Sequence, residues 1–166
     1  MRKVIVNSTS LITLSKLRHL TLLRELYEEI IIPYAVKEEI TVKNDLSSQD
    51  VLDNLSWIKV TACPIVDRKI FSSKLHAGEV EVLILAQNLQ ADLIIVDDKP
   101  ARKAATFLGF EITGTIGVLV KAKKRGLIKA VKPFIESMKE INIRLSDDVI
   151  NMALSAAGES LQTEQS

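Results

Sequence analysis

Short runs of consecutive apolar residues recur along the chain and predict buried strands. They occupy residues 4–6, 30–32 and 93–96, where valine, isoleucine and leucine fill every position. Runs of this length between polar residues are typical of strands covered on both faces, as in a parallel sheet. Residues 57–62 alternate well enough to predict a strand at the sheet edge, and residues 110–113 predict a short last strand.

Between these runs, apolar residues recur at the three- and four-residue spacing of helices. The predicted helices cover residues 11–17 (capped by Ser8, Thr9 or Ser10), 20–27, 33–42, 66–75, 79–89, 101–108, 115–125, 128–141 and 146–157. Residues 43–50 are polar and predict a surface loop, and residues 158–166 predict a polar, flexible tail. Strands that alternate with helices indicate an α/β fold with a mainly parallel sheet.

Composition narrows the class of protein. A chain of 166 residues, 47% hydrophobic and 26% charged, fits one soluble globular domain. The net charge of +1 means that nucleic-acid binding would have to rely on local basic patches. The single cysteine, Cys63, excludes an intramolecular disulfide and favours a reducing cytoplasm. The first apolar run is too short for a signal peptide, and no segment reaches membrane-spanning length.

Acidic residues follow the best of the predicted strands. Asp97 and Asp98 come directly after residues 93–96, and Asn7 follows the first strand. In open α/β sheets, ligands bind at the carboxyl ends of the strands. Glu39 and Glu79 lie on predicted helices that can reach the same edge. Because clustered carboxylates repel one another, we expect a divalent cation such as Mg²⁺ or Mn²⁺ among them.

Each acid also has a simpler interpretation. Asp98 precedes Lys-Pro and suits a helix cap, and Asp97 suits a solvated loop. Glu39 fits an exposed helix face, and Glu79 fits an acid that stabilises the first turn of its own helix.

Basic residues gather in two places. They suit phosphate contacts that position a nucleic acid without reading its sequence, or simply a solvated face. The candidates for nucleic-acid contact are Lys99, Arg102, Lys121, Lys124 and Arg125.

Together these features resemble the PIN-domain nucleases, most closely the VapC-like proteins of prokaryotes. The likeness rests on residues 4–12, 32–40, 75–86, 96–102, 113–119 and 125–128. It places Asn7, Glu39, Glu79 and Asp98 at the four acidic positions of the family, with Asp97 as a companion of Asp98.

The resemblance implies a three-layer α/β/α sandwich over residues 1–157 and a Mg²⁺- or Mn²⁺-dependent endoribonuclease. Glu39, Glu79 and Asp98 would be the main metal ligands, supported by Asp97 and Asn7. Thr9 would hold the turn after the first strand. The resemblance further implies the toxin of a toxin–antitoxin pair, a small antitoxin partner and a homodimer.

Asn7 departs from the family pattern, because an aspartate usually occupies this position. An amide oxygen can ligate a metal but contributes no charge. The alternative hypothesis is therefore a weakly active or inactive PIN-like module that binds RNA or protein.

Overall fold

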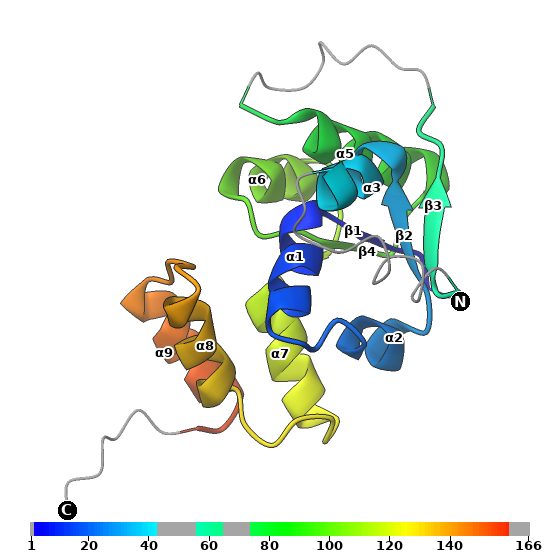
Figure 1. The fold of residues 1–166 in the computed structure, drawn as a ribbon. Helices are drawn as coiled ribbons and strands as arrows, with labels where there is room; N and C mark the ends of the chain where they lie inside the picture. The colour runs from blue at the N-terminus through cyan, green and yellow to red at the C-terminus, as the bar shows by residue number, and fades with distance from the viewer. Residues whose placement is uncertain (1, 43–55, 65–73, 160–166) are drawn as a thin grey trace, which may run out of the picture. The chain divides into compact units, whose positions relative to one another are not determined.

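The computed structural model describes residues 2–42, 56–64 and 74–159. Within them, five strands form one all-parallel sheet in the order β3-β2-β1-β4-β5 (Figure 1). The strands are β1 (Val4–Val6), β2 (Ile30–Pro33), β3 (Ile58–Thr61), β4 (Leu93–Ile95) and β5 (Ile112–Thr113). The predicted parallel sheet is confirmed, and so is the edge position of β3.

The described residues also form eight helices. They are α1 (Ser8–Lys16), α2 (Leu22–Tyr27), α3 (Tyr34–Val42), α5 (Ala77–Leu89), α6 (Lys99–Phe107), α7 (Thr115–Lys124), α8 (Lys132–Glu140) and α9 (Asp147–Ala156). The predicted loop at residues 43–50 and nearly all of the predicted helix at residues 66–75 lie outside the described residues.

Several helix boundaries differ from the prediction. Helix α1 begins at Ser8, because Asn7 rather than a hydroxyl residue occupies the N-cap position. Pro33 is the last residue of β2, paired with Thr61, and α3 starts one residue later. Helix α8 begins at Lys132, four residues after the predicted start.

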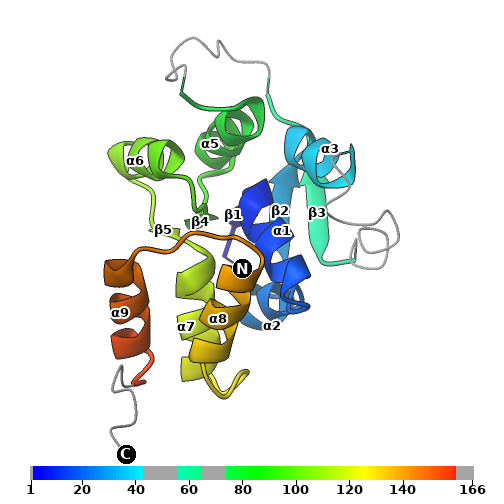
Figure 2. The same cartoon turned by 60° about the vertical axis from the view of Figure 1, so that its left-hand side comes forward.

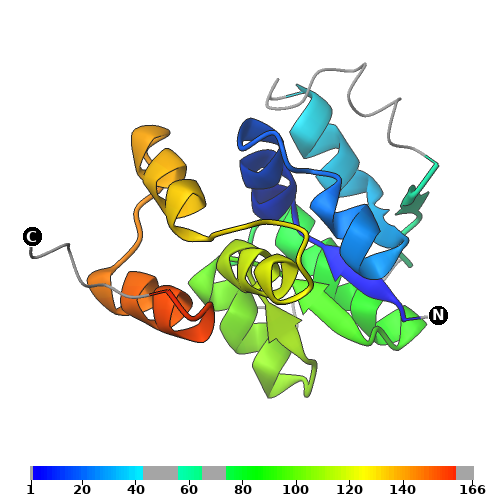
Figure 3. The ribbon, with the colours of Figure 1, turned by 90° about the horizontal axis from the view of Figure 1, so that it is seen from below.

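The chain divides into two compact units, the first ending at Thr115 and the second starting at Ile116. The first unit contains the sheet between two helical layers. Helices α1, α2 and α3 lie on one side and α5 and α6 on the other (Figure 3). Connections between parallel strands are nearly always right-handed, and the chain runs from β1 out to β3 before it returns to β4, so this rule accounts for the division. The PIN-like α/β/α fold is thereby confirmed.

The centre of the sheet is fully buried. Strands β1 and β4 pair in register, with Val4, Ile5 and Val6 opposite Leu93, Ile94 and Ile95. All three β1 residues have no exposed surface. Removing such side chains from water is the main force that stabilises the sheet, at about 1.5–3 kcal/mol for each fully buried residue. This pairing places the residues after β1 and β4 next to each other at the carboxyl end.

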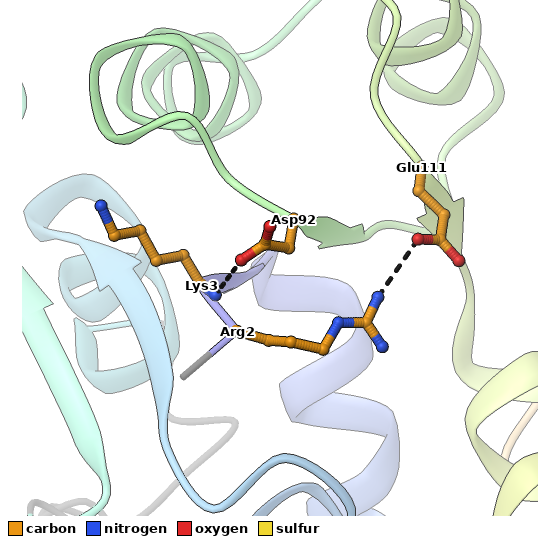
Figure 4. Close-up of polar contacts among 4 residues, drawn as sticks. All are labelled: Arg2, Lys3, Asp92 and Glu111. Carbon is orange, nitrogen blue, oxygen red and sulfur yellow. Dashed lines mark hydrogen bonds and ion pairs between the residues drawn. The ribbon is translucent and has the colours of Figure 1, made fainter.

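The amino end of the same strands is closed by exposed polar contacts (Figure 4). The backbone N–H of Lys3, before β1, donates to Asp92 Oδ2 before β4, at 2.6 Å. Arg2 Nη2 donates to Glu111 Oε2 before β5, at 3.1 Å. These contacts tie β1 to both strands on that side of the sheet.

The second unit contains α8, α9 and all of α7 after its first residue (Figure 2). Glu159 accepts hydrogen bonds from the backbone N–H groups of Val131 (2.7 Å) and Lys132 (3.0 Å), at the start of α8. Its carboxylate also pairs with Lys123 at 3.1 Å. Glu159, which belongs to the predicted tail, therefore closes the first turn of α8. None of the helices in the described segments is long and apolar enough to cross a membrane.

Candidate functional site

Asn7 lies at the centre of the carboxyl end of the sheet. Its backbone N–H donates to the Ile95 carbonyl at 2.9 Å, which extends the pairing of β1 with β4. The residue is 2% exposed, and no group of the described chain reaches its buried Oδ1 atom. Burying an unpaired acceptor costs about 1–3 kcal/mol. An atom of this kind suits a hydrogen-bond donor or a cation.

Asp98 follows β4 and is the N-cap of α6. Its Oδ2 accepts a hydrogen bond from the Ala101 backbone N–H at 3.2 Å, and Pro100 lies in the first turn. The simpler interpretation of Asp98 as a cap is thus confirmed. An ionised carboxylate has about four acceptor positions on its two oxygens, so capping is compatible with metal binding.

Glu39 projects from α3 and is half-buried. Its Oε2 accepts a hydrogen bond from Ser8 Oγ at 2.9 Å. A Cβ atom on Gly78 would lie 3.1 Å from the same Oε2, so glycine in the first turn of α5 leaves room for this carboxylate. The exposed-face interpretation of Glu39 is wrong, because its carboxylate lies between α1 and α5.

Glu79 is 7% exposed in the first turn of α5, and its Oε2 accepts from the His76 backbone N–H at 3.0 Å. It therefore stabilises its own helix, as the simpler interpretation expected. Burial raises the pKa of its carboxyl above the ordinary value, and the negative charges of Asp98 and Glu39 raise it further. The His76 backbone bond and imidazole oppose the shift. Asp98 and Glu39 thus lie close enough for their negative charges to act on Glu79.

Asp97 is half-buried, and both of its carboxylate oxygens accept hydrogen bonds. Its Oδ1 accepts from the Thr115 backbone N–H at 2.7 Å. Its Oδ2 accepts from Thr115 Oγ1 at 2.6 Å and from Ser10 Oγ at 3.0 Å. Three of its acceptor positions are therefore used by donors from the first unit.

The donor set fits a hard divalent cation. In the described ranges, no three side chains of His, Cys, Asp or Glu lie close enough to hold one ion. Magnesium usually takes only one or two carboxylates and completes its shell with water and substrate oxygens. By chemical type, one or two of the carboxylates Glu39, Glu79 and Asp98 with the unpaired oxygen of Asn7 match this set of ligands. All are oxygen ligands, which Mg²⁺ and Mn²⁺ prefer.

The remaining predicted residues lie in different surroundings. Thr9 is exposed, and its neighbours Ser8 and Ser10 make the turn contacts expected of it. Arg102 is half-buried, and its Nη1 donates to the Val96 carbonyl at 2.9 Å. Lys99 is exposed in the first turn of α6. The candidates of the second unit lie at the end of α7: Lys121, Lys124 and Arg125.

Sequence reasoning missed Ser10, Thr115 and Gly114. A signal was present, because hydroxyl residues follow both strands that flank β4, and Asp97 follows β4 itself. These hydroxyl residues can be paired with Asp97 only when the strand order β1-β4-β5 is known, and the pattern of apolar residues does not predict that order.

Comparison with known proteins agrees with this architecture. A family model described as a PIN domain matches residues 3–159. No curated protein matches the chain. The match spans both compact units and all the residues of the candidate site. The chain therefore belongs to the PIN-domain family.

Proposed function

We propose that this protein is a Mg²⁺- or Mn²⁺-dependent endoribonuclease of the VapC-like type. PIN domains have a nuclease-type fold, so hydrolysis of a phosphodiester bond is the activity that membership favours. The observation that carries the proposal is the buried, unpaired oxygen of Asn7 at the carboxyl end of the sheet, together with the buried Glu79, whose pKa the charges of Asp98 and Glu39 help to raise. A site of this kind is stabilised by a cation.

Asn7, Glu39, Glu79 and Asp98 are the residues that would hold the cation. When bound, it would offset their charge, bring the scissile phosphate to the site and lower the pKa of a water molecule. The acids are already oriented before the cation arrives. Each carboxylate accepts a hydrogen bond that orients it: Glu39 from Ser8 Oγ, Glu79 from the His76 backbone N–H, and Asp98 from the Ala101 backbone N–H.

The substrate phosphate would be positioned by helix ends and cations. The N-caps of helices α1, α5 and α6 are Asn7, His76 and Asp98, and backbone N–H groups at a helix N-terminus favour phosphate oxygens. Lys99 and Arg102 add positive charge beside the start of α6. These contacts involve the backbone of the nucleic acid, so RNA sequence would be selected by other parts of the surface.

The direct test is cleavage of a labelled structured RNA by the purified protein in Mn²⁺, with EDTA as the blank. Asp98→Asn should abolish cleavage while the protein stays folded. Asp92→Asn, at the opposite end of β4, is the matched control and should cleave like the wild type. Undiminished cleavage by Asp98→Asn would contradict the assignment of Asp98.

Asn7 favours a second candidate function, a weakly active PIN module that acts by binding RNA or protein. The missing charge lowers the attraction of the site for a dication, because each unit charge at about 4 Å contributes about 4 kcal/mol at an effective dielectric near 20. If the wild type binds RNA without cleaving it and Asn7→Asp cleaves, the module is the correct description. Rapid cleavage by the wild type would exclude it.

The proposal extends to a toxin in the cytoplasm, a small antitoxin partner and a homodimer. Induced expression should then arrest growth, and co-expression of a small protein from the adjacent gene should restore it. Asp98→Asn should remove the arrest. Light scattering on the purified protein would measure the mass and test the dimer.

A further inference from the structure

Asp97 joins three segments at the carboxyl end of the sheet. It follows β4, and it accepts hydrogen bonds from Ser10 in the first turn of α1 and from Thr115 after β5. We propose that Asp97 is a positioning residue, which fixes Asn7 and Asp98 relative to each other, and that it is not a cation ligand. The proposal rests on the proposed function only in assuming that the site binds a cation.

The acceptor capacity of Asp97 is largely used. Three donors reach its two oxygens at distances between 2.6 and 3.0 Å. A cation ligand would have to share oxygens that already accept these charge-assisted bonds, which are among the stronger hydrogen bonds in proteins. Asp98, in contrast, uses one oxygen for the cap of α6. The two adjacent aspartates therefore have different roles.

The three hydrogen bonds of Asp97 to Ser10 and Thr115, called the Asp97 bracket below, connect segments that carry the expected cation ligands. Ser10 lies three residues after Asn7 in α1, and Ser8 between them donates to Glu39. Asp97 also directly precedes Asp98 in the chain. Loss of the bracket would let the start of α1 shift relative to the end of β4, and the ligands on both would shift with them.

Gly114 shows that the chain is built for close approach at Asp97. A Cβ atom at this position would lie 2.6 Å from Asp97 Oδ1 and 3.0 Å from Arg102 Nη1. Contacts under about 3 Å are far below ordinary van der Waals separation, so a side chain at 114 would displace the Asp97 carboxylate, the Arg102 guanidinium or the segment before Thr115. Glycine at 114 is thus part of the same bracket.

The test is the affinity for Mn²⁺, measured by calorimetry without RNA, with far-UV circular dichroism and melting temperature for each variant. Asp97→Ala should weaken Mn²⁺ binding by about 10- to 100-fold, the usual cost of losing a residue that orients metal ligands. Asp97→Asn should restore most of the affinity. Its amide oxygen can accept from the Thr115 N–H, and its NH₂ group can donate to the two hydroxyls.

The partners provide the decisive variants. Ser10→Ala combined with Thr115→Val removes both hydroxyls and leaves Asp97 charged. If Asp97 positions the ligands, this pair should lose nearly as much affinity as Asp97→Ala, and the triple variant should lose little more. Asp92→Ala is the matched control, because it removes a hydrogen-bonded carboxylate at the other end of β4. It should lower the melting temperature without changing Mn²⁺ affinity.

Two results would overturn the proposal. Asp97→Asn as weak as Asp97→Ala, with normal affinity in the hydroxyl variants, would identify Asp97 as a ligand. Unchanged affinity in all these variants would leave the bracket a purely structural element. Failure of the nuclease proposal gives a different result. The wild type would then bind Mn²⁺, and the variants would show the expected differences in Mn²⁺ affinity, but the protein would not cleave RNA.

Discussion

Both ends of the central sheet carry acids, but the acids make different kinds of contact at the two ends. At the amino end, Asp92 accepts from the Lys3 backbone and Glu111 pairs with Arg2. At the carboxyl end, Asp97 joins the same three strands through Ser10 and Thr115. The contacts at the amino end are exposed and include an ion pair. At the carboxyl end, the half-buried Asp97 accepts only from neutral donors, and the buried Glu79 lies at the same end of the sheet.

We infer from this difference that the contacts at the amino end serve stability, whereas the residues at the carboxyl end serve ligand binding. The pair of Arg2 and Glu111, with side chains 48% and 69% exposed, holds strands together at little electrostatic cost. The carboxyl end holds Glu79 in a repelling environment and Asn7 with an unpaired oxygen. Unfavourable arrangements of this kind persist where a ligand is to be bound. Four predictions test the comparison, from the largest expected effect to the smallest.

The largest effect should follow from Asp98→Ala. Loss of one carboxylate ligand should weaken Mn²⁺ binding by at least about 100-fold, because the attraction removed is several kcal/mol at an effective dielectric near 20. Calorimetric titration measures it. Asp92→Ala, which removes a carboxylate from the other end of the strand, should leave the affinity within about twofold of the wild type. Equal losses in both variants would contradict the comparison.

Asn7→Asp should strengthen Mn²⁺ binding by about tenfold or more, since it adds a charge where the amide has none. The same substitution should lower the free energy of unfolding of the metal-free protein by about 1–3 kcal/mol, because another buried carboxylate joins the cluster. Urea denaturation in EDTA and in Mn²⁺ measures both effects. A metal-free variant as stable as the wild type would show that Asn7 is not surrounded by repelling acids.

Glu79→Gln should change how stability depends on pH. The folded-state pKa of Glu79 lies above its ordinary value of 4.5, so the folded protein binds the proton more tightly than the unfolded chain. The resulting stabilisation is fully present below pH 4.5 and is lost as the pH rises through the folded-state pKa.

Denaturation of the metal-free protein between pH 4.5 and neutrality should therefore show this loss in the wild type but not in Glu79→Gln. At neutral pH the variant should be more stable by about 1 kcal/mol, a factor of about five in the folding equilibrium. A variant with the wild-type pH profile would contradict the raised pKa.

The smallest effect should come from Arg2→Ala at the amino end. An exposed ion pair contributes about 0.2–1 kcal/mol, and salt screens it. Urea denaturation at low and high salt should show a loss within that range that shrinks as salt is added. Mn²⁺ affinity should not change. A larger or salt-independent loss would mean that this end stabilises the sheet by some other contact.

The apolar pattern was sufficient to predict the layers of the fold. Runs of consecutive aliphatic residues identify β1, β2 and β4 because both faces of a central parallel strand are buried. The ends of helices were less predictable. Helix α1 starts at Ser8 with Asn7 as its N-cap. Ser8 and Ser10 bond to acids from other elements instead of capping the helix, and no local pattern reveals such partners.

The candidate site shows the same division. Asn7, Glu39, Glu79 and Asp98 could be chosen from the sequence, because oxygen-bearing residues at strand and helix ends have a limited set of uses. The distinct role of Asp97 could not, since Asp97 and Asp98 look equivalent in the chain. Their difference arises from the donors that meet Asp97: Thr115 is 18 residues away in the sequence and Ser10 is 87.

By itself, the sequence determined which segments become strands and helices and which residue types can bind a cation, because burial and side-chain chemistry are local properties. Only the tertiary structure decided which of those residues are available to a cation and which are used in hydrogen bonds within the protein. Strand order sets which side chains face Asp97, and burial sets how strongly the acids repel one another. Both depend on contacts between residues that are distant in the chain, and such contacts form only when the sheet is assembled.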